Sequence, residues 1–198
     1  MNNRAGKTLW VMRHGRPDVP LNPLLMTRAE FNDYLHRYDV AGLSQSEADR
    51  LTQAYQGYPV PDLVIASDLP RARETAELFG RGAPIIVDPL FREIPVKVPE
   101  DASTWFLTRR WPSEMWWSYL RVAWFFNIPP EGYDKSTLRS RQAAQEIVRH
   151  QDAVSSLAVV SHSGFLLVTV NQMMRQGLLV GRRLPHIGFG EPTTYRWH

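Results

Sequence analysis

Short apolar segments alternate with helix-like stretches along most of this chain, and this alternation narrows the possible folds more than any other feature. The segments are 8–12 (TLWVM), 62–67 (DLVIAS), 83–89 (APIIVDP) and 156–162 (SLAVVSH). Each has the length and composition of a buried strand. Strands that alternate with helices predict an α/β fold, in which helices cover both faces of a sheet that is at least partly parallel.

Helix signals fill most of the intervals between these strands. We expect helices over 42–58, 68–80, 136–151 and 164–177 and a last strand over 193–197. In the first helix, Ser44 and Glu47 have the spacing of a capping box. Ser67 or Asp68 is expected to cap the second helix, and Gly80 to follow its last residue. The residues between the first strand and position 42 are interpreted as a polar stretch without a helix.

The length of the chain suits one domain. Its 198 residues, 43% of them apolar, suffice for one sizeable core. We find no internal repeat and no low-complexity linker. Residues 96–134 break the alternation and hold five of the seven tryptophans. We therefore expect a single domain over 1–198 with an inserted segment at about 96–134.

Charge and composition exclude several classes of function. The net charge of +3 and the pI near 9.4 give a mild cationic bias, which suits a small anionic substrate but is too weak for a nucleic-acid binder. The absence of cysteine excludes disulfides, zinc fingers and thiol catalysis. The N-terminus lacks the apolar core of a signal peptide, and no apolar run has the length of a membrane span. We therefore expect a cytoplasmic protein without stable membrane insertion.

Reactive side chains follow the first four of the five predicted strands. Arg13 and His14 end the first strand, Arg71 lies in the opening turn after the second, Glu93 follows the third and His162 ends the fourth. Ligands of open α/β sheets bind beyond the carboxyl ends of the strands. If the four ends converge, the site contains two imidazoles, two guanidiniums and one carboxyl group.

This set of groups suits phosphoryl transfer. Guanidiniums bind phosphate oxygens in a bidentate way and stay charged. A neutral imidazole is a competent nucleophile, and Arg13 and Arg71 should disfavour protonation of His14. A carboxyl group with a raised pKa can protonate the departing oxygen. No metal or cofactor is needed, and the six histidines show no metal-ligand spacing.

Four motifs in the order RHG (13–15), SDLPRARETA (67–76), LFREI (90–94) and VVSHSG (159–164) resemble the histidine phosphatase superfamily, also called phosphoglycerate mutase-like. The resemblance covers 8–94 and 136–176 well and the segment between them poorly. It implies a three-layer α/β/α sandwich with a mostly parallel central sheet. The tryptophan-rich segment would then be an inserted, aromatic-rich cap.

The resemblance also implies roles for single residues. His14 matches the histidine that is transiently phosphorylated, and Glu93 stands where the proton donor is expected. Arg13, Arg71 and His162 match the groups that hold the phosphoryl group. The substrate-binding set that we predict is Arg13, Arg16, Arg71, His162, Ser163 and Gly164. Gly15 and Gly164 would let the backbone approach the phosphate closely.

The chain departs from the family pattern directly after RHG. Arg16 and Pro17 stand where many members have an acidic or small residue and then a hydroxyl residue, and Pro20 stands where they have asparagine. Arg16 would replace one of the lost contacts. The longer signature segments of the mutases are missing, which favours a phosphatase. A phosphomutase, and a catalytically weak phosphate-binding protein, stay open as alternatives, and the sequence does not identify the physiological substrate.

Other interpretations, in which some of these residues have no catalytic role, also stay open. Arg71 could pair with Glu74 or Glu77 on a helix surface. Asp68 or Glu74 could act in place of Glu93. A serine hydrolase is disfavoured because SHSGF lacks the glycine pattern of a nucleophile elbow.

The tryptophan-rich segment 103–127 admits three interpretations. Trp116, Leu120 and Trp124 recur at helical spacing, which indicates a helix with a covered face. That face could cover the mouth of the site as a cap, form a homodimer contact or lie on a membrane surface. In a cap, Arg109, Arg110 and a tryptophan would contact the substrate. The substrate would then be a phosphomonoester with a second acidic group or an aromatic part.

Overall fold

The computed structural model describes residues 6–20, 24–98, 109–128 and 130–198, which form one six-stranded sheet in the order β3-β2-β4-β1-β6-β5. The strands are β1 (Thr8–Arg13), β2 (Leu63–Ala66), β3 (Ile85–Val87), β4 (Ser156–Ser161), β5 (Leu179–Val180) and β6 (Thr193–Trp197). The pairs β1–β4, β2–β4 and β2–β3 are parallel. The pairs β1–β6 and β5–β6 are antiparallel. The five predicted strands are confirmed; the two-residue β5 was not predicted.

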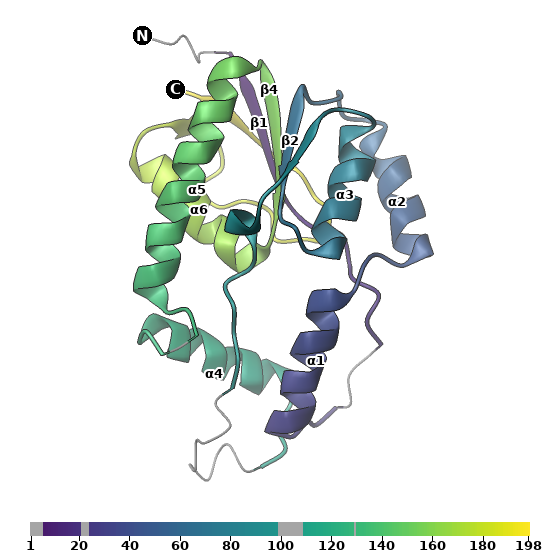
Figure 1. The fold of residues 1–198 in the computed structure, drawn as a ribbon, viewed down its shortest axis with the longest axis vertical. Coiled ribbons are helices and arrows are strands. Elements are labelled where there is room, and N and C mark those ends of the chain that lie inside the picture. Colours follow the sequence, from purple (N-terminus) through teal and green to yellow (C-terminus); the bar gives the residue numbers. More distant parts are fainter. Residues whose placement is uncertain (1–5, 21–23, 99–108, 129) are drawn as a thin grey trace.

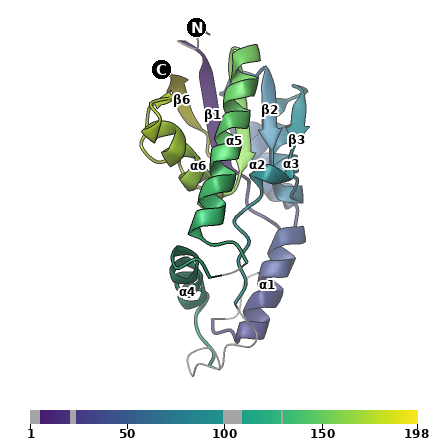
Figure 2. The same cartoon turned by 60° about the vertical axis from the view of Figure 1, so that its left-hand side comes forward.

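Helices cover the sheet on both faces, with α2 and α3 on one face and α5 and α6 on the other (Figures 1 and 2). The helices are α1 (Arg28–Val40), α2 (Gln45–Tyr55), α3 (Pro70–Gly80), the 3₁₀ turn η1 (Pro89–Phe91), α4 (Ser113–Phe125), α5 (Tyr133–Ala153) and α6 (Ser163–Arg175). The predicted three-layer sandwich is therefore confirmed. In the residues that the structure describes, no helix is long and apolar enough to cross a membrane.

The alternation of side chains along β1 explains the two covered faces. Leu9 and Val11 pack with α5 and α6, whereas Trp10 and Met12 pack with α2 and α3. All four are buried, because a strand between two helical layers exposes neither face. Burial of apolar surface on both faces fixes the register of the central strands and thereby the positions of their ends.

Two predicted helix starts are corrected by the structure. Ser44 accepts a hydrogen bond from the Glu47 amide (3.3 Å), but the Glu47 carboxylate binds Arg16 and Arg50, so the capping box is only half formed. Neither Ser67 nor Asp68 caps α3; its N-cap is Leu69, with no side-chain cap.

The predicted end of α3 is also corrected. Gly80 is the last helical residue, and Arg81 adopts a left-handed conformation (φ 44°) at the C-cap. The helix therefore continues one residue further than expected.

α1 and α4 pack against each other to form what we call the α1–α4 unit. The buried residues of its core are Met26, Phe31, Leu35, Val98, Trp116 and Leu120. Backbone hydrogen bonds of 2.8 Å in both directions tie Met26 to Trp111, and Trp116 Nε1 donates to the Met26 carbonyl (3.0 Å). The prediction of a polar stretch without a helix at 28–40 is wrong. Only two residues of α1 are buried, so its sequence carries little apolar periodicity.

The α1–α4 unit lies beyond the carboxyl ends of the parallel strands (Figure 1). α4 lies within the range 96–134, and α5 begins at Tyr133, inside the end of that range. Residues 103–108 of the tryptophan-rich segment lie outside the described residues. The division into one domain with an inserted cap stays a prediction.

Candidate active site

Three neighbouring strands place most of the predicted site residues side by side. β4 lies between β1 and β2, so His14, His162 and Arg71 follow adjacent strand ends. The imidazoles of His14 and His162 have centroids 4.9 Å apart, and Arg71 Nε lies 3.2 Å from His14 Nε2. The expected convergence of these three side chains is therefore present in the structure.

His14 is buried and held in one tautomer by its own loop. Its Nδ1 lies 2.6 Å from the Gly15 carbonyl, which can only accept, so Nδ1 carries the proton. Nε2 therefore presents a lone pair to Arg71. Burial, and then the charges of Arg71 and Arg13, hold the pKa of His14 well below its usual range. At neutral pH the ring is uncharged, which a nucleophile requires.

Arg71 is a buried guanidinium with donors on two sides. Besides Nε to His14, its Nη1 donates to the carbonyls of Tyr38 (2.6 Å) and Asp39 (3.1 Å). Nη2 lies 3.3 Å from the Asp39 carboxylate and 3.5 Å from His162 Nδ1. These contacts, rather than pairing with Glu74 or Glu77, direct Arg71 into the site.

His162 is oriented by Ser67, which we had expected to cap α3. Its Nε2 lies 2.9 Å from Ser67 Oγ, and both residues are fully buried. Burial, the His14 ring and the charges of Arg71 and Arg13 lower the pKa of His162 well below its usual range. The pair of histidines is therefore neutral together.

Arg13 directly precedes His14 and contacts Tyr38 and Phe189. Its guanidinium donates to Tyr38 Oη (3.1 Å) and to the Ile187 carbonyl (3.1 Å) and lies 3.7 Å from the centre of the Phe189 ring. Within the part of the chain that the structure describes, Arg13 Nε is buried without a hydrogen-bond partner. A buried donor of this kind costs free energy until an acceptor binds it.

Glu93 lies at the N-terminus of α6. Its carboxyl oxygens accept hydrogen bonds from the amides of Ile94 (3.0 Å), Phe165 (3.0 Å) and Gly164 (3.3 Å). Burial raises the pKa of Glu93, and these amides and the charge of Arg13 oppose the rise only in part. A carboxyl group with a raised pKa is suited to donate a proton.

The carboxylates considered as substitutes for Glu93 are engaged elsewhere. Asp68 forms a bidentate ion pair with Arg92 (2.6 and 2.5 Å), and Glu74 accepts from the Leu43 amide (2.5 Å). Glu93 is therefore the acid that the structure favours for the site.

Close contacts with neighbouring side chains require glycine at positions 15 and 164. A Cβ on Gly15 would meet Leu51 at 2.6 Å, and one on Gly164 would meet Glu93 at 2.9 Å. Gly15 also donates its amide to Thr75 Oγ1 (2.8 Å), which fixes the loop after His14 to α3. Gly164 thus positions Glu93, and Gly15 packs against α2. Ser163, the first residue of α6, lies half-buried beside Gly164.

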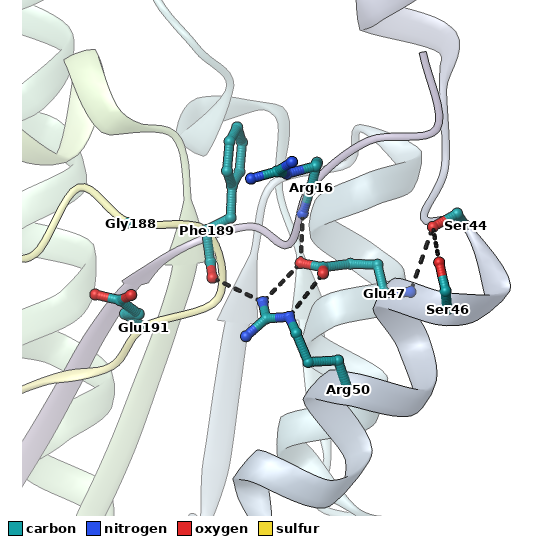
Figure 3. Close-up of a pocket in the computed structure, with 8 residues that line it drawn as sticks. All are labelled: Arg16, Ser44, Ser46, Glu47, Arg50, Gly188, Phe189 and Glu191. Atoms are coloured by element: carbon teal, nitrogen blue, oxygen red, sulfur yellow. Dashed lines mark hydrogen bonds and ion pairs between the residues drawn. The ribbon is translucent and has the colours of Figure 1, made fainter. Parts of the chain in front are cut away.

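Arg16 is placed apart from the histidines. It is exposed and lines a hollow of about 630 Å³ together with Ser44, Ser46, Glu47, Arg50, Gly188, Phe189 and Glu191 (Figure 3). Its guanidinium lies 5.5 Å from the centre of the Phe189 ring, which in turn lies 5.7 Å from the His14 ring. A substrate contact by Arg16 stays a prediction.

The cap residues expected to meet the substrate have other contacts. Arg110 pairs with Glu30 (2.6 Å) at the start of α1, and Trp116 lies fully buried in the core of the α1–α4 unit. Trp124 donates from Nε1 to Ser136 Oγ (2.9 Å) on α5. The contact of Arg109 or of a tryptophan with substrate stays a prediction.

Sequence reasoning missed four residues that touch the site: Ser67, Tyr38, Asp39 and Phe189. Ser67 had a usable signal, because it directly follows β2 just as His162 directly follows β4. Tyr38 and Asp39 end a helix that was not predicted, and Phe189 comes from the loop before β6. Among the described residues, no three histidine, aspartate or glutamate side chains are grouped to hold a metal ion.

Comparisons with known proteins find a sequence family and solved structures that this chain resembles. A profile of the histidine phosphatase superfamily (branch 1) matches residues 9–196. Mycobacterial glucosyl-3-phosphoglycerate phosphatase in complex with VO3 has a TM-score of 0.61 at 19% identity, covering 97% of this chain and 96% of that one. Its complex with inorganic phosphate has a TM-score of 0.61 at 19% identity, with 97% and 94% covered. Mycobacterial hydrolase 2 has a TM-score of 0.61 at 20% identity, with 97% and 83% covered. These likenesses show a shared fold. A search of curated protein sequences finds no match.

Proposed function

Because the chain belongs to the histidine phosphatase superfamily (branch 1), we propose that it hydrolyses small phosphomonoesters through a phosphohistidine on Nε2 of His14. One observation carries the proposal. His14 is neutral, its Nδ1 donates to the Gly15 carbonyl, and its unprotonated Nε2 accepts from Nε of Arg71. An uncharged nucleophile beside a fixed cation suits attack on an anionic phosphorus centre.

In the first step, Nε2 of His14 forms a bond to phosphorus while the bond from phosphorus to the ester oxygen breaks. Glu93 transfers its proton to that oxygen, so that the alcohol leaves uncharged. Arg13, Arg71 and His162 hold the remaining phosphoryl oxygens. The unpartnered Nε of Arg13 is a donor ready for one of them. The guanidinium charges stabilise the developing transition-state charge, so the step needs no metal.

In the second step, water attacks the phosphohistidine. The Glu93 carboxylate takes a proton from the water, the bond from phosphorus to Nε2 breaks, and inorganic phosphate leaves. Glu93 then has its proton again, and His14 its lone pair. The fold shared with a mycobacterial phosphatase in complex with inorganic phosphate supports this product.

Covalent labelling tests the proposal most directly. The protein is mixed with a ³²P-labelled phosphomonoester and quenched, and the label is tested for lability in acid and stability in base. We expect an acid-labile label and turnover of 4-nitrophenyl phosphate in the unaltered chain, with and without a chelator. His14→Ala should abolish the label and lower turnover by at least about 10³-fold.

His150→Ala is the matched control, because His150 pairs with Glu146 on the surface of α5. It should label and turn over like the unaltered chain. Full activity of His14→Ala would overturn the mechanism. Transfer of label to a second position of the substrate, rather than to water, would identify a mutase. Phosphate binding without label or turnover would identify a binding protein.

A further inference from the structure

Asp39 stands at the boundary between the active site and a groove outside it. Its carboxylate lies 3.3 Å from Nη2 of Arg71, whose side chain is only 1% exposed, yet the Asp39 side chain is itself 61% exposed. The same residue lines a groove of about 610 Å³ between α1 and the segment that follows Glu93. The lining residues are Asn32, Asp33, Leu35, His36, Asp39, Val40, Val96 and Lys97.

The groove adjoins the site at two places, Asp39 and the segment that follows Glu93. The leaving oxygen must lie opposite His14 and within reach of Glu93, because attack is in line. Val96 and Lys97 follow Glu93 by three and four residues, so the same stretch of chain connects the proton donor with the groove. Arg71 connects the other end, since it contacts both His14 and Asp39.

We propose that this groove receives the leaving group and that Asp39 selects against leaving groups with a second negative charge. The inference rests on the proposed function. The sequence had led us to expect a second acidic group on the substrate, bound by Arg109 or Arg110. The inference differs from that expectation, because the charged group beside the Arg71 guanidinium at this groove is the Asp39 carboxylate.

A bound phosphate strengthens the effect of Asp39. Without a ligand, Arg71 neutralises the Asp39 carboxylate. A phosphoryl group bound to the same guanidinium shares its positive charge. The negative charge of Asp39 is then less fully neutralised toward the groove. A carboxylate on the leaving group would then be repelled, whereas a hydroxyl or ammonium group would not. Asp33, also on the groove, is already paired with Arg37 (3.0 Å).

Three small esters that differ in charge test the inference: ethylene glycol monophosphate, O-phosphoethanolamine and phosphoglycolate. Each is used as a competitive inhibitor of 4-nitrophenyl phosphate hydrolysis, so the result does not depend on its own turnover. We expect phosphoglycolate to inhibit most weakly. In Asp39→Asn, the inhibition constant of phosphoglycolate relative to that of ethylene glycol monophosphate should fall about fivefold, since a like charge has been removed.

Asp49→Asn provides the matched control, because Asp49 lies on the exposed surface of α2 and pairs with Gln45. It makes the same charge change and should leave the ratio unaltered. A ratio that Asp39→Asn does not change, or an equal change for all three esters, would overturn the inference while hydrolysis of 4-nitrophenyl phosphate persists. Absence of that hydrolysis in the unaltered chain would instead overturn the proposed function.

Discussion

The carboxyl-end edge of the sheet and the α1–α4 unit both place residues around Arg13 and Arg71, but they do so in different ways. At the sheet edge, His14 and His162 directly follow the paired strands β1 and β4, so the strand register fixes their separation. In the α1–α4 unit, Tyr38 and Asp39 end a helix that is held by contacts with distant residues such as Trp116. In the proposed mechanism the sheet edge therefore supplies the reacting groups, and the α1–α4 unit supplies residues that surround them.

The shifted pKa values of the site and the proposed selection of the ester therefore depend on different parts of the molecule. The lowered pKa of His14 and the raised pKa of Glu93 both arise mainly from burial within the sheet edge. The proposed selection among esters would instead depend on Asp39 of α1, which lies outside the strands. A fold of this kind can keep one reaction while its outer helices adapt to different leaving groups.

The largest effect that should follow from this division is that of Glu93→Gln at the sheet edge. The substituted amide keeps the size of the side chain but cannot transfer a proton, so kcat for alkyl phosphates should fall by about 10³-fold. The loss for 4-nitrophenyl phosphate should be about tenfold or less, because its leaving group needs little protonation. Steady-state kinetics on the two ester classes measures the difference.

Glu77→Gln, on the exposed surface of α3, is the control and should retain both activities. Equal losses for the two ester classes would contradict the role of Glu93 as proton donor. Such a result would also mean that the sheet edge does not contain all of the catalytic chemistry.

The two histidines of the sheet edge were predicted well because each of them directly follows a strand. RHG and VVSHSG follow apolar runs whose pairing was expected, and the structure places His14 and His162 with centroids 4.9 Å apart. Glu93 was predicted from its motif, and in the structure it lies at the N-terminus of α6. The amides of Gly164 and Phe165 were not predictable as its partners, because they come from a helix about 70 residues away.

The α1–α4 unit was predicted poorly because its two halves depend on each other. α1 buries only Phe31 and Leu35, so its own sequence resembles a polar loop. It has a surface to pack on only when Trp116 and Leu120 of α4 are present. Nothing in the local pattern of either segment states that 28–40 and 113–125 form one core, so Asp39 could not be assigned to the site.

The second effect concerns a substitution that destabilises only the α1–α4 unit. Leu120 is 4% exposed in the core of the unit, whereas Phe125, on the same helix, is 64% exposed. Leu120→Ala should lower the free energy of unfolding by about 3 kcal/mol through the cavity that it leaves. Phe125→Ala should lower it by about 0.5 kcal/mol or less. Urea unfolding measures both, and equal effects would contradict the assigned core.

The smallest effect is a dependence of stability on pH that belongs to the sheet edge. His14 and His162 have pKa values well below 6.5 in the folded chain, mainly through burial. Below about pH 6.5 the unfolded chain binds protons that the folded chain does not, so stability falls as the pH decreases. Between pH 7.5 and 5.5 the loss should be about 1–3 kcal/mol. The raised pKa of Glu93 acts in the opposite direction, because the folded chain keeps that proton to a higher pH than the unfolded chain does.

Urea unfolding at pH 7.5, 6.5 and 5.5 measures this loss, and His14→Asn locates it. Removing one of the two buried imidazoles should reduce the loss to about half, since each contributes at most one proton. The residues of the α1–α4 core are apolar and contribute none. If His14→Asn kept the full pH dependence, His14 would contribute no part of the acid sensitivity. The assignment of a lowered pKa to His14 would then be wrong.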